Sequence, residues 1–165
     1  MTCLIWLMES GSTQGRLSKN LSIVEGEECD ANSEIGTNTP EACIVKVDAS
    51  DSIITNRGFS YFRECKRLEE LKMNFCDFFG DDGIRELALG RPALTLKNIE
   101  IVCNPMLTDS AAQWLVKLRA LQRAHFYFLP YVVNRTAMLR VLRLNLPKCK
   151  VTFPELGKIG YGYEE

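Results

Sequence analysis

Cysteine is the residue type in this chain best suited to chemistry, because a thiolate can serve as a nucleophile, a metal ligand or half of a disulfide. The cysteines are odd in number, scattered, and contain no Cys-x-x-Cys pair. Their spacing therefore predicts neither a zinc site nor a disulfide framework, and a reducing compartment is the simpler expectation. The seven are Cys3, Cys29, Cys43, Cys65, Cys76, Cys103 and Cys149.

Other candidate catalytic groups are sparse. The single histidine, His125, has no cysteine or carboxylate spaced as a recognisable catalytic pair. The Asp81-Asp82-Gly83 cluster is typical of a turn and helix cap more than of a metal loop. The glycines in residues 157–162 lack the following Lys-Ser/Thr of a phosphate-binding loop. We therefore expect no enzyme, no cofactor and no metal.

The elements that would position these groups are clearest in residues 96–118, LKNIEIVCNPMLTDSAAQWLVKL. Alternation at Ile99 and Ile101 predicts a short strand, and the spacing of Ala112, Leu115 and Leu118 predicts a helix. Thr108 or Asp109 is the expected N-cap between them. Such a unit cannot bury its own apolar face, so it needs similar units beside it.

The chain supplies those units at a nearly constant interval. One apolar residue at the centre of each expected strand forms the first series, with intervals of 26, 28, 25 and 25: Val47, Met73, Ile101, Phe126 and Val151. An apolar residue at each strand-to-helix turn forms the second, with intervals of 25, 28 and 26: Ile54, Phe79, Leu107 and Val133. The helices that follow are expected at residues 59–65, 84–89, 111–118 and 137–144.

This period fits the leucine-rich-repeat pattern L-x-x-L-x-L-x-x-N/C, in which Cys76 and Asn104 take the structural strand-end position. Gly90-Arg91-Pro92 accounts for the longer third interval as a loop insertion. We predict an α/β fold, a short leucine-rich-repeat solenoid of about four strand–helix repeats with a closing strand at residues 149–153. Its parallel sheet would form the concave face, with the helices outside.

Composition divides the chain into three parts. Residues 1–43 are rich in Ser, Gly, Asn, Thr and Glu, so we expect a disordered or truncated N-terminal segment. The leucine-rich-repeat domain would span residues 44–154, followed by a flexible tail at 155–165. No run approaches the roughly 20 apolar residues of a membrane-spanning helix. Residues 110–153 hold eight bases and no acid, which predicts one positive end although the net charge is −1.

Residues between the buried strand positions should line up across the concave face. The first expected row is Lys46, Lys72, Glu100, His125 and Lys150. The second is Asp48, Asn74, Val102, Tyr127 and Thr152. The third is Ala49, Phe75, Cys103, Phe128 and Phe153.

Aromatic residues beside a polar row indicate a protein-binding surface if they are exposed. It is equally consistent with the sequence that Phe75, Phe128 and Phe153 enter the core at irregular strand ends. The partner-binding candidates are Lys72, Asn74, Phe75, Glu100, Val102, Cys103, His125, Tyr127 and Phe128, with the basic residues Arg119, Arg123, Arg140 and Arg143.

Several segments resemble the family of ATP synthase subunit s, also called coupling factor B, which includes the distal membrane-arm assembly protein of respiratory complex I. They are IVKVDASDSIITNRGF (44–59), the Asp82-Gly83 turn, the inserted loop before NIEIVCNPMLTD, FLPYV (128–132) and LPKCKV (146–151). The resemblance covers about residues 44–153, and LPKCKV is closer to the complex I paralogue. It implies a non-enzymatic protein on the matrix side of the mitochondrial inner membrane.

Two departures limit what the resemblance carries over. The family's N-terminal segment, which holds a metal site in coupling factor B, has no counterpart in residues 1–43, so no metal ligand is assigned. Of that protein's close pair of cysteines on the second strand, only Cys76 has a match, within Asn74-Phe75-Cys76. No import signal is visible in residues 1–43 either.

The sequence thus predicts a non-enzymatic mitochondrial protein that binds and helps assemble or couple an inner-membrane respiratory complex, either the complex I membrane arm or ATP synthase. Peripheral contact with the anionic inner membrane is a further candidate interaction. Nucleic acid is not an expected partner, because base-stacking motifs are lacking. The alternative is a substrate-recognition module of an F-box ubiquitin ligase, although the Ser/Glu-rich segment does not resemble an F-box.

Overall fold

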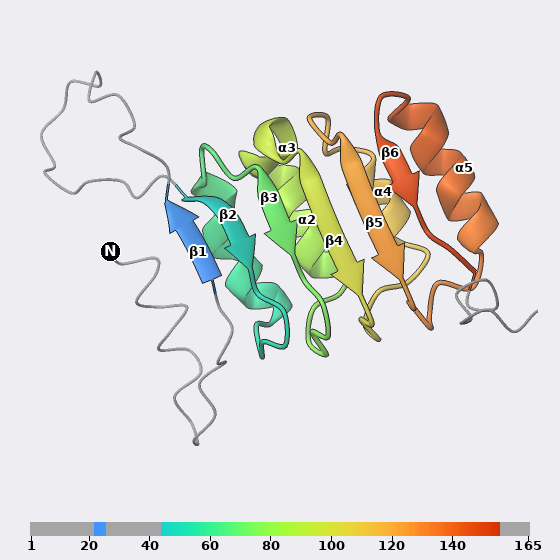
Figure 1. Ribbon diagram of the computed structural model, residues 1–165, viewed down its shortest axis with the longest axis horizontal. Coiled ribbons are helices and arrows are strands. Elements are labelled where there is room, and N and C mark those ends of the chain that lie inside the picture. The colour runs from blue at the N-terminus through green and yellow to red at the C-terminus, as the bar shows by residue number, and fades with distance from the viewer. Residues whose placement is uncertain (1–21, 26–43, 156–165) are drawn as a thin grey trace, which may run out of the picture.

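Short stretches of alternating apolar and polar residues form a six-stranded sheet in the computed structural model, which describes residues 22–25 and 44–155. Its strands lie side by side in sequence order (Figure 1). They are β1 (Ser22–Glu25), β2 (Ile44–Asp48), β3 (Glu70–Lys72), β4 (Asn98–Val102), β5 (Arg123–Tyr127) and β6 (Lys150–Thr152). Strands β2 to β6 are parallel, and β1 pairs antiparallel with β2. The predicted α/β class with a parallel sheet is confirmed.

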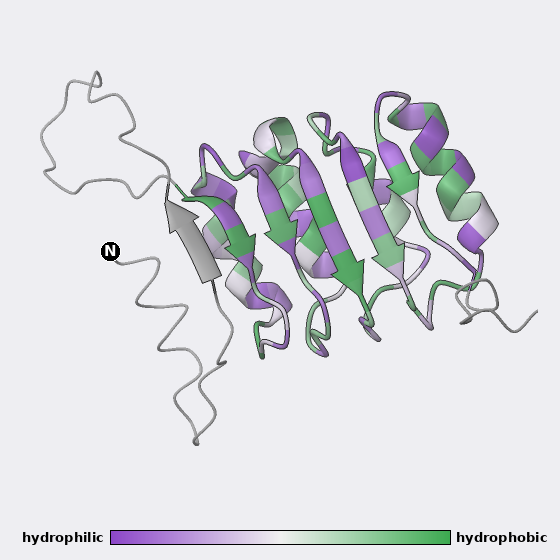
Figure 2. Ribbon diagram, in the orientation of Figure 1, coloured by the Kyte–Doolittle hydropathy of each residue, from purple (hydrophilic) through white to green (hydrophobic). Residues whose placement is uncertain are grey.

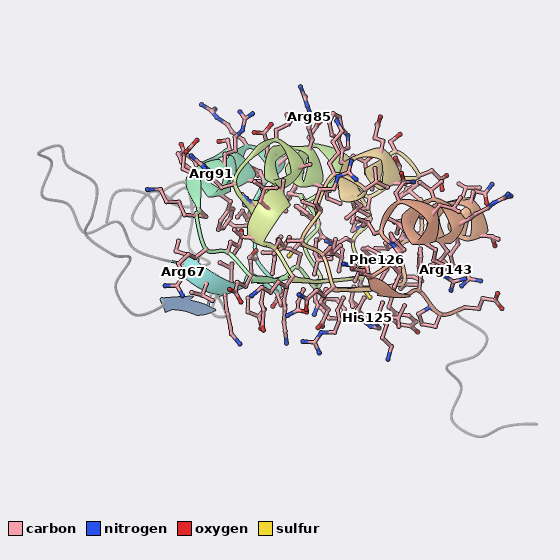
Figure 3. The ribbon with its side chains drawn as sticks, turned by 90° about the horizontal axis from the view of Figure 1, so that it is seen from above. Arg67, Arg85, Arg91, His125, Phe126 and Arg143 are labelled. Carbon is pink, nitrogen blue, oxygen red and sulfur yellow. The ribbon has the colours of Figure 1, made fainter. Side chains whose placement is uncertain are left out.

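The helices all cover one side of this sheet and leave the other side open (Figure 3). They are the 3-10 helix η1 (Asn56–Glu64) and the α-helices α2 (Asp81–Leu89), α3 (Pro92–Thr95), α4 (Ala111–Leu115) and α5 (Arg135–Asn145). The four expected helices are present with shifted ends; α4 stops at Leu115, where the chain enters a turn. The short helix α3 was not expected, since Gly90-Arg91-Pro92 was interpreted as a loop. None of the helices in the described ranges has the length and hydropathy of a bilayer crossing.

The core fills the layer between the sheet and the helices. Strand side chains alternate between this layer and the open side, which Figure 2 shows as hydrophobic and hydrophilic bands along β2 to β5. Leu71, Met73, Ile101 and Phe126 are each at most 1% exposed. Phe59 packs on Phe79 with their ring centroids 4.5 Å apart, so η1 and the turn after β3 share one core.

The strand register differs from the expected series at both ends of the sheet. Val47 pairs with Leu71, and not with Met73 as the interval of 26 predicted. Val151 pairs with Ala124, and not with Phe126. Residues two apart in a strand share a face, so an apolar pattern cannot distinguish registers that differ by two residues. The middle of the series is correct, because Ile101 pairs with Phe126.

Two further expectations need correction. The turn anchor after β5 is Val132, which is 8% exposed, whereas Val133 is 87% exposed. Residues 1–43 were expected to lack regular structure, yet Ser22–Glu25 forms β1. A pairing partner is available there, because the outer edge of β2 presents backbone N–H and C=O groups. The rest of 1–43, the glycines of 157–162 and the tail from 156 lie outside the described residues.

Candidate functional site

The open face of the sheet, defined as its side away from the helices, carries two rows of mostly polar side chains. His125 points from this face while Phe126, the next residue, lies between sheet and helices (Figure 3). The observed pairing gives the first row as Lys46, Glu70, Asn98, Arg123 and Lys150. The second is Asp48, Lys72, Glu100, His125 and Thr152. Lys72, Glu100 and His125 therefore align as expected. Lys46 and Lys150 were expected beside them but lie in the first row, whose other members belonged to none of the expected rows. Asp48 and Thr152 were expected beside Asn74, Val102 and Tyr127 but lie in the second row.

Polar contacts link the first row across four strands. Lys46 Nζ lies 3.1 Å from Glu70 Oε1. Asn98 Nδ2 donates to the same oxygen at 3.3 Å, and Arg123 Nε donates to Asn98 Oδ1 at 2.8 Å. Because Asn98 donates to Glu70 and accepts from Arg123, it connects an acidic side chain on β3 to a basic one on β5.

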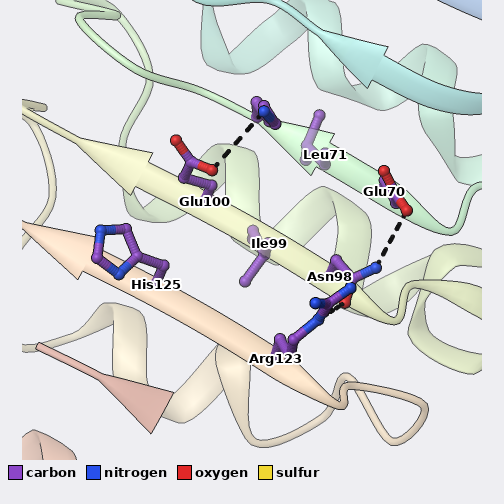
Figure 4. Close-up of a pocket in the computed structure, with 8 residues that line it drawn as sticks. Glu70, Leu71, Asn98, Ile99, Glu100, Arg123 and His125 are labelled. Atoms are coloured by element: carbon purple, nitrogen blue, oxygen red, sulfur yellow. Dashed lines mark hydrogen bonds and ion pairs between the residues drawn. The ribbon is translucent and has the colours of Figure 1, made fainter. Parts of the chain in front are cut away.

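Contacts of the second row join β3 to β4 and β5 to β6. Lys72 Nζ lies 3.9 Å from Glu100 Oε2, and Asn74 Nδ2 donates to Glu100 Oε1 at 2.7 Å. His125 Nδ1 and Thr152 Oγ1 are 2.7 Å apart. Between the two rows lies a shallow depression of about 250 Å³, with a floor at Leu71 and Ile99 and walls of the charged side chains (Figure 4).

Charge is uneven along the open face. The carboxylates of Glu70 and Glu100 have lysine partners on the neighbouring strand toward β2. Toward β6, Arg123 and Lys150 have no carboxylate partner among the residues that the structure describes. Exposed ion pairs contribute at most about 1 kcal/mol each, so this face is suited to reversible, salt-sensitive contacts. Its β5–β6 side favours an anionic partner.

The third expected row divides between surface and core. Phe75 is 57% exposed and Phe128 is 43% exposed, whereas Phe153 is 8% exposed and packs on Phe126 at a centroid distance of 5.9 Å. In the first unit the residue that matches this row is Asp51, in the turn after β2, and not Ala49, which is buried. Asp51, Phe75, Cys103 and Phe128 all have positive φ, between 48° and 57°. This conformation is costly for a bulky side chain and turns the chain out of each strand.

The basic candidates do not form one patch. Arg123 is on the open face, while Arg119 lies before β5, where its N–H donates to Ala93 O at 2.8 Å. Arg140 and Arg143 belong to α5, in the helix layer. The other partner-binding candidates, Val102 and Tyr127, are partly buried neighbours on β4 and β5.

The thiols of Cys76, Cys103 and Cys149 are poorly suited to nucleophilic chemistry. Cys76 is fully buried, and its Sγ donates to Ala49 O at 3.1 Å. Burial raises the pKa of the Cys76 thiol, and the bonds from Ser52 offset this only in part. Burial also raises the pKa of Cys103 and Cys149. Across residues 44–155 no three His, Cys, Asp or Glu side chains are grouped to hold a metal ion.

Polar side chains at the turns after the strands tie each unit to the next. Asn56 Oδ1 accepts from the N–H groups of Gly80 and Gly83 at 2.8 and 3.1 Å. Asp81 accepts from the N–H and Oγ1 of Thr108 at 3.0 and 2.5 Å.

The turns after β4 and β5 are joined in the same way. The Asp109 carboxylate accepts from the N–H groups of Val133 and Asn134 at 3.2 and 2.9 Å. Ser110 is the residue that precedes α4, but its side chain makes no capping bond. Of the two expected caps, Thr108 accepts the Ser110 N–H through Oγ1 at 3.1 Å, and Asp109 is engaged in the contact with the next unit.

Sequence reasoning missed one set of exposed residues at these turns. Ile53, Phe78, Met106 and Tyr131 each follow a strand, and each is between 50% and 62% exposed. Their spacing of 25, 28 and 25 was present in the sequence. It was missed because a periodic pattern does not separate exposed apolar residues from buried ones.

These features define an α/β domain of successive strand–turn–helix units with one open sheet face. In comparisons with known proteins, neither a family model nor a curated protein matches the chain.

Proposed function

We propose that this protein is a leucine-rich-repeat binding protein of mitochondria, which helps to assemble or couple an inner-membrane respiratory complex, either the complex I membrane arm or ATP synthase. It acts on the matrix side of the inner membrane. Its role is to hold a partner subunit, and it catalyses no reaction.

The observation that carries the proposal is the resemblance of residues 44–153 to the subunit s family. The resembling segments fall on strands and on the connections next to them. IVKVDASDSIITNRGF includes β2, its turn and the start of η1, and NIEIVCNPMLTD includes β4 and its turn. LPKCKV leads from α5 into β6. Segments that determine the turns of a repeat are a more specific likeness than its apolar positions.

The strand-end contacts support the leucine-rich-repeat assignment. Asn104 is fully buried, and its Oδ1 accepts from the backbone N–H of Cys76 at 3.0 Å. A buried Asn or Cys that bonds neighbouring backbone is what the repeat pattern requires at this position. The parallel strands in sequence order, with helices on one side, also suit a solenoid.

The open face is the proposed partner site. Lys72, Glu100 and His125 project from adjacent strands in register, so they present a fixed array to a partner. On the β5–β6 side, Arg123 and Lys150 would meet acidic side chains of the partner subunit. Contacts of this kind accelerate association and discriminate between partners more than they add affinity.

Affinity purification from mitochondria tests the proposal. The tagged protein should recover complex I or ATP synthase subunits, and recovery should fall at raised ionic strength because the contacts are charged. Recovery of neither complex, or of a Skp-type adaptor in their place, contradicts it.

Two charge-reversal pairs locate the surface. Arg123→Glu with Lys150→Glu changes the open face, and Arg140→Glu with Arg143→Glu changes α5 by the same charge. The first pair should release the respiratory subunits and the second should retain them. If both pairs retain the subunits, the open face is not the binding site.

A further inference from the structure

A second surface lies at the turns where the parallel strands end. Ile53, Phe78, Met106 and Tyr131 occupy equivalent positions in four successive turns, and each is at least half exposed. Phe75 and Phe128 are also exposed, and each comes three residues before Phe78 or Tyr131, just after β3 or β5 has ended. We call these six residues the apolar edge. Because adjacent strands are about 4.8 Å apart, four equivalent positions span about 15 Å, the length of roughly ten helical residues.

The apolar edge is held in place by the chain beneath it. Gly80 forms a β-bridge with Met106, and a Cβ at Gly80 would lie 2.6 Å from Met106 O. The contacts of Asn56, Asp81 and Asp109 fix the same turns to one another. A partner therefore meets a preformed surface, and little ordering of the protein opposes binding.

The backbone under the two aromatic residues is strained. Phe75 and Phe128 have φ values of 57° and 48°, in the left-handed region that Gly or Asn adopts at lower cost. Neither side chain offsets this by entering the core, since both are exposed. Asp51 and Cys103 share this conformation at the equivalent strand ends, so the turn imposes it in each unit. In two units the turn holds a large aromatic ring in solvent.

Exposed carboxylates lie in the same turns as the apolar edge. Asp51 and Asp77 are exposed, and neither has an ion-pair partner in the part of the chain that the structure describes. Asp82 and Asp109 lie in the same turns and are also exposed. Asp82 already has an ion-pair partner, Arg85, at 3.9 Å, and the Arg135 guanidinium is paired with Glu155, so Asp51 and Asp77 are the carboxylates left for a partner. The charge around this edge is thus complementary to a basic partner.

We propose that the apolar edge binds an amphipathic, basic polypeptide segment of a partner protein, which presents one line of apolar side chains flanked by lysines or arginines. Its apolar line contacts Ile53, Phe78, Met106 and Tyr131, and its cations contact the Asp51 and Asp77 carboxylates. This surface is separate from the open face, and the inference does not depend on the mitochondrial role.

A synthetic 14-residue helix with leucines on one face and lysines elsewhere is the probe, measured by fluorescence anisotropy with the full-length protein. Phe78→Ser with Tyr131→Ser should weaken its binding about tenfold or more, because two central contacts are lost. Leu94→Ser with Leu144→Ser is the matched control, since these leucines are 70% and 72% exposed at other sites. Circular dichroism melting checks that both variants fold.

The electrostatic part has its own test. Asp51→Asn with Asp77→Asn should weaken the lysine peptide several-fold, and a peptide with glutamates in place of lysines should bind weakly. Equal binding of the two peptides overturns the proposal, as does wild-type affinity in the Phe78/Tyr131 variant.

Two other occupants would also overturn it. If Leu4→Ser with Trp6→Ser in the full chain raises peptide affinity about tenfold, the chain's own N-terminal segment covers the edge. If the protein dimerises in sedimentation velocity and Phe78→Ser with Tyr131→Ser abolishes the dimer, a second copy covers it. A monomer whose affinity is unaffected by the Leu4/Trp6 change supports a separate partner.

Discussion

The side chain of Asn104 accepts, through Oδ1, the backbone N–H of Cys76 at 3.0 Å, although the two residues are 28 positions apart. Both are fully buried, so water cannot replace this bond. The strand end of one unit is therefore held by a side chain of the next. The Cys76 thiol repeats the relationship one unit earlier, but here the side chain is the donor, to Ala49 O at 3.1 Å.

Asn104→Ala should destabilise the protein by about 2–4 kcal/mol, because it leaves the buried Cys76 N–H unpaired and opens a cavity. Urea unfolding measures the change. Asn145→Ala is the control, since Asn145 is exposed on α5 and bonds only to Val141 O, and it should change stability by less than about 0.5 kcal/mol. Equal effects of the two substitutions would show that Asn104 does not hold the strand ends.

Asp81 and Asp82 are adjacent acids that should respond differently to substitution. Asp81→Ala removes the acceptor of two bonds from Thr108 and should cost about 1.5–3 kcal/mol. Asp82 is exposed, and its one ion pair, with Arg85, is long at 3.9 Å. Asp82→Ala should therefore change the free energy of unfolding by less than about 0.5 kcal/mol. Thermal unfolding of both variants compares them directly, and a larger loss at Asp82 would contradict the assigned contacts.

The sequence was sufficient to predict the units of this fold because burial repeats at a nearly fixed interval. Ile99 and Ile101 alternate as a strand requires, and the strand-end role of Cys76 and Asn104 followed from the repeat pattern. The register at Val47 and Val151 could not be read in the same way, because a shift of two residues keeps every side chain on the same face.

The candidate site was predictable only where register was correct. Lys72, Glu100 and His125 were aligned correctly, since each comes one residue before Met73, Ile101 or Phe126, the part of the apolar series whose relative register was right. The exposure of Phe78 and Tyr131 could not be read from residue type, because aromatic residues in turns occur both in cores and at surfaces. The role of Asp81 also required the structure: its acceptors face Thr108, 27 residues away, while sequence alone indicated a local cap.

Phe75→Gly should leave the free energy of unfolding within about 1 kcal/mol of wild type, even though it removes a whole aromatic side chain. Glycine relieves the left-handed backbone at φ 57°, which offsets the loss of the half-buried ring. Phe126→Ala removes a ring that is buried between the sheet and the helices, and it should lower the free energy of unfolding by about 3–5 kcal/mol. A loss of that size at Phe75 in urea unfolding would mean that its ring stabilises the core.

The buried Cys76 thiol should make stability depend on pH in the alkaline range. Burial raises its pKa above the ordinary thiol value of 9.0, so below pH 9 the thiol is protonated in both the folded and unfolded states and stability is unaffected. Above pH 9 the unfolded thiol ionises while the folded one keeps its proton. The unfolded state then binds fewer protons, and stability falls as pH rises, by at most about 1.4 kcal/mol per pH unit for one thiol.

Cys76→Ser isolates this contribution, because serine keeps a donor for Ala49 O and does not titrate in this range. Urea unfolding of both proteins between pH 7 and 10.5 should give parallel curves up to about pH 9 and a shallower decline for the variant above it. Part of the decline remains in the variant, since burial also raises the pKa of Cys103 and Cys149. Because lysines and tyrosines titrate in both proteins, the difference between the curves is the quantity that matters. A constant difference across the whole range would mean that Cys76 ionises as readily in the folded protein as in the unfolded chain.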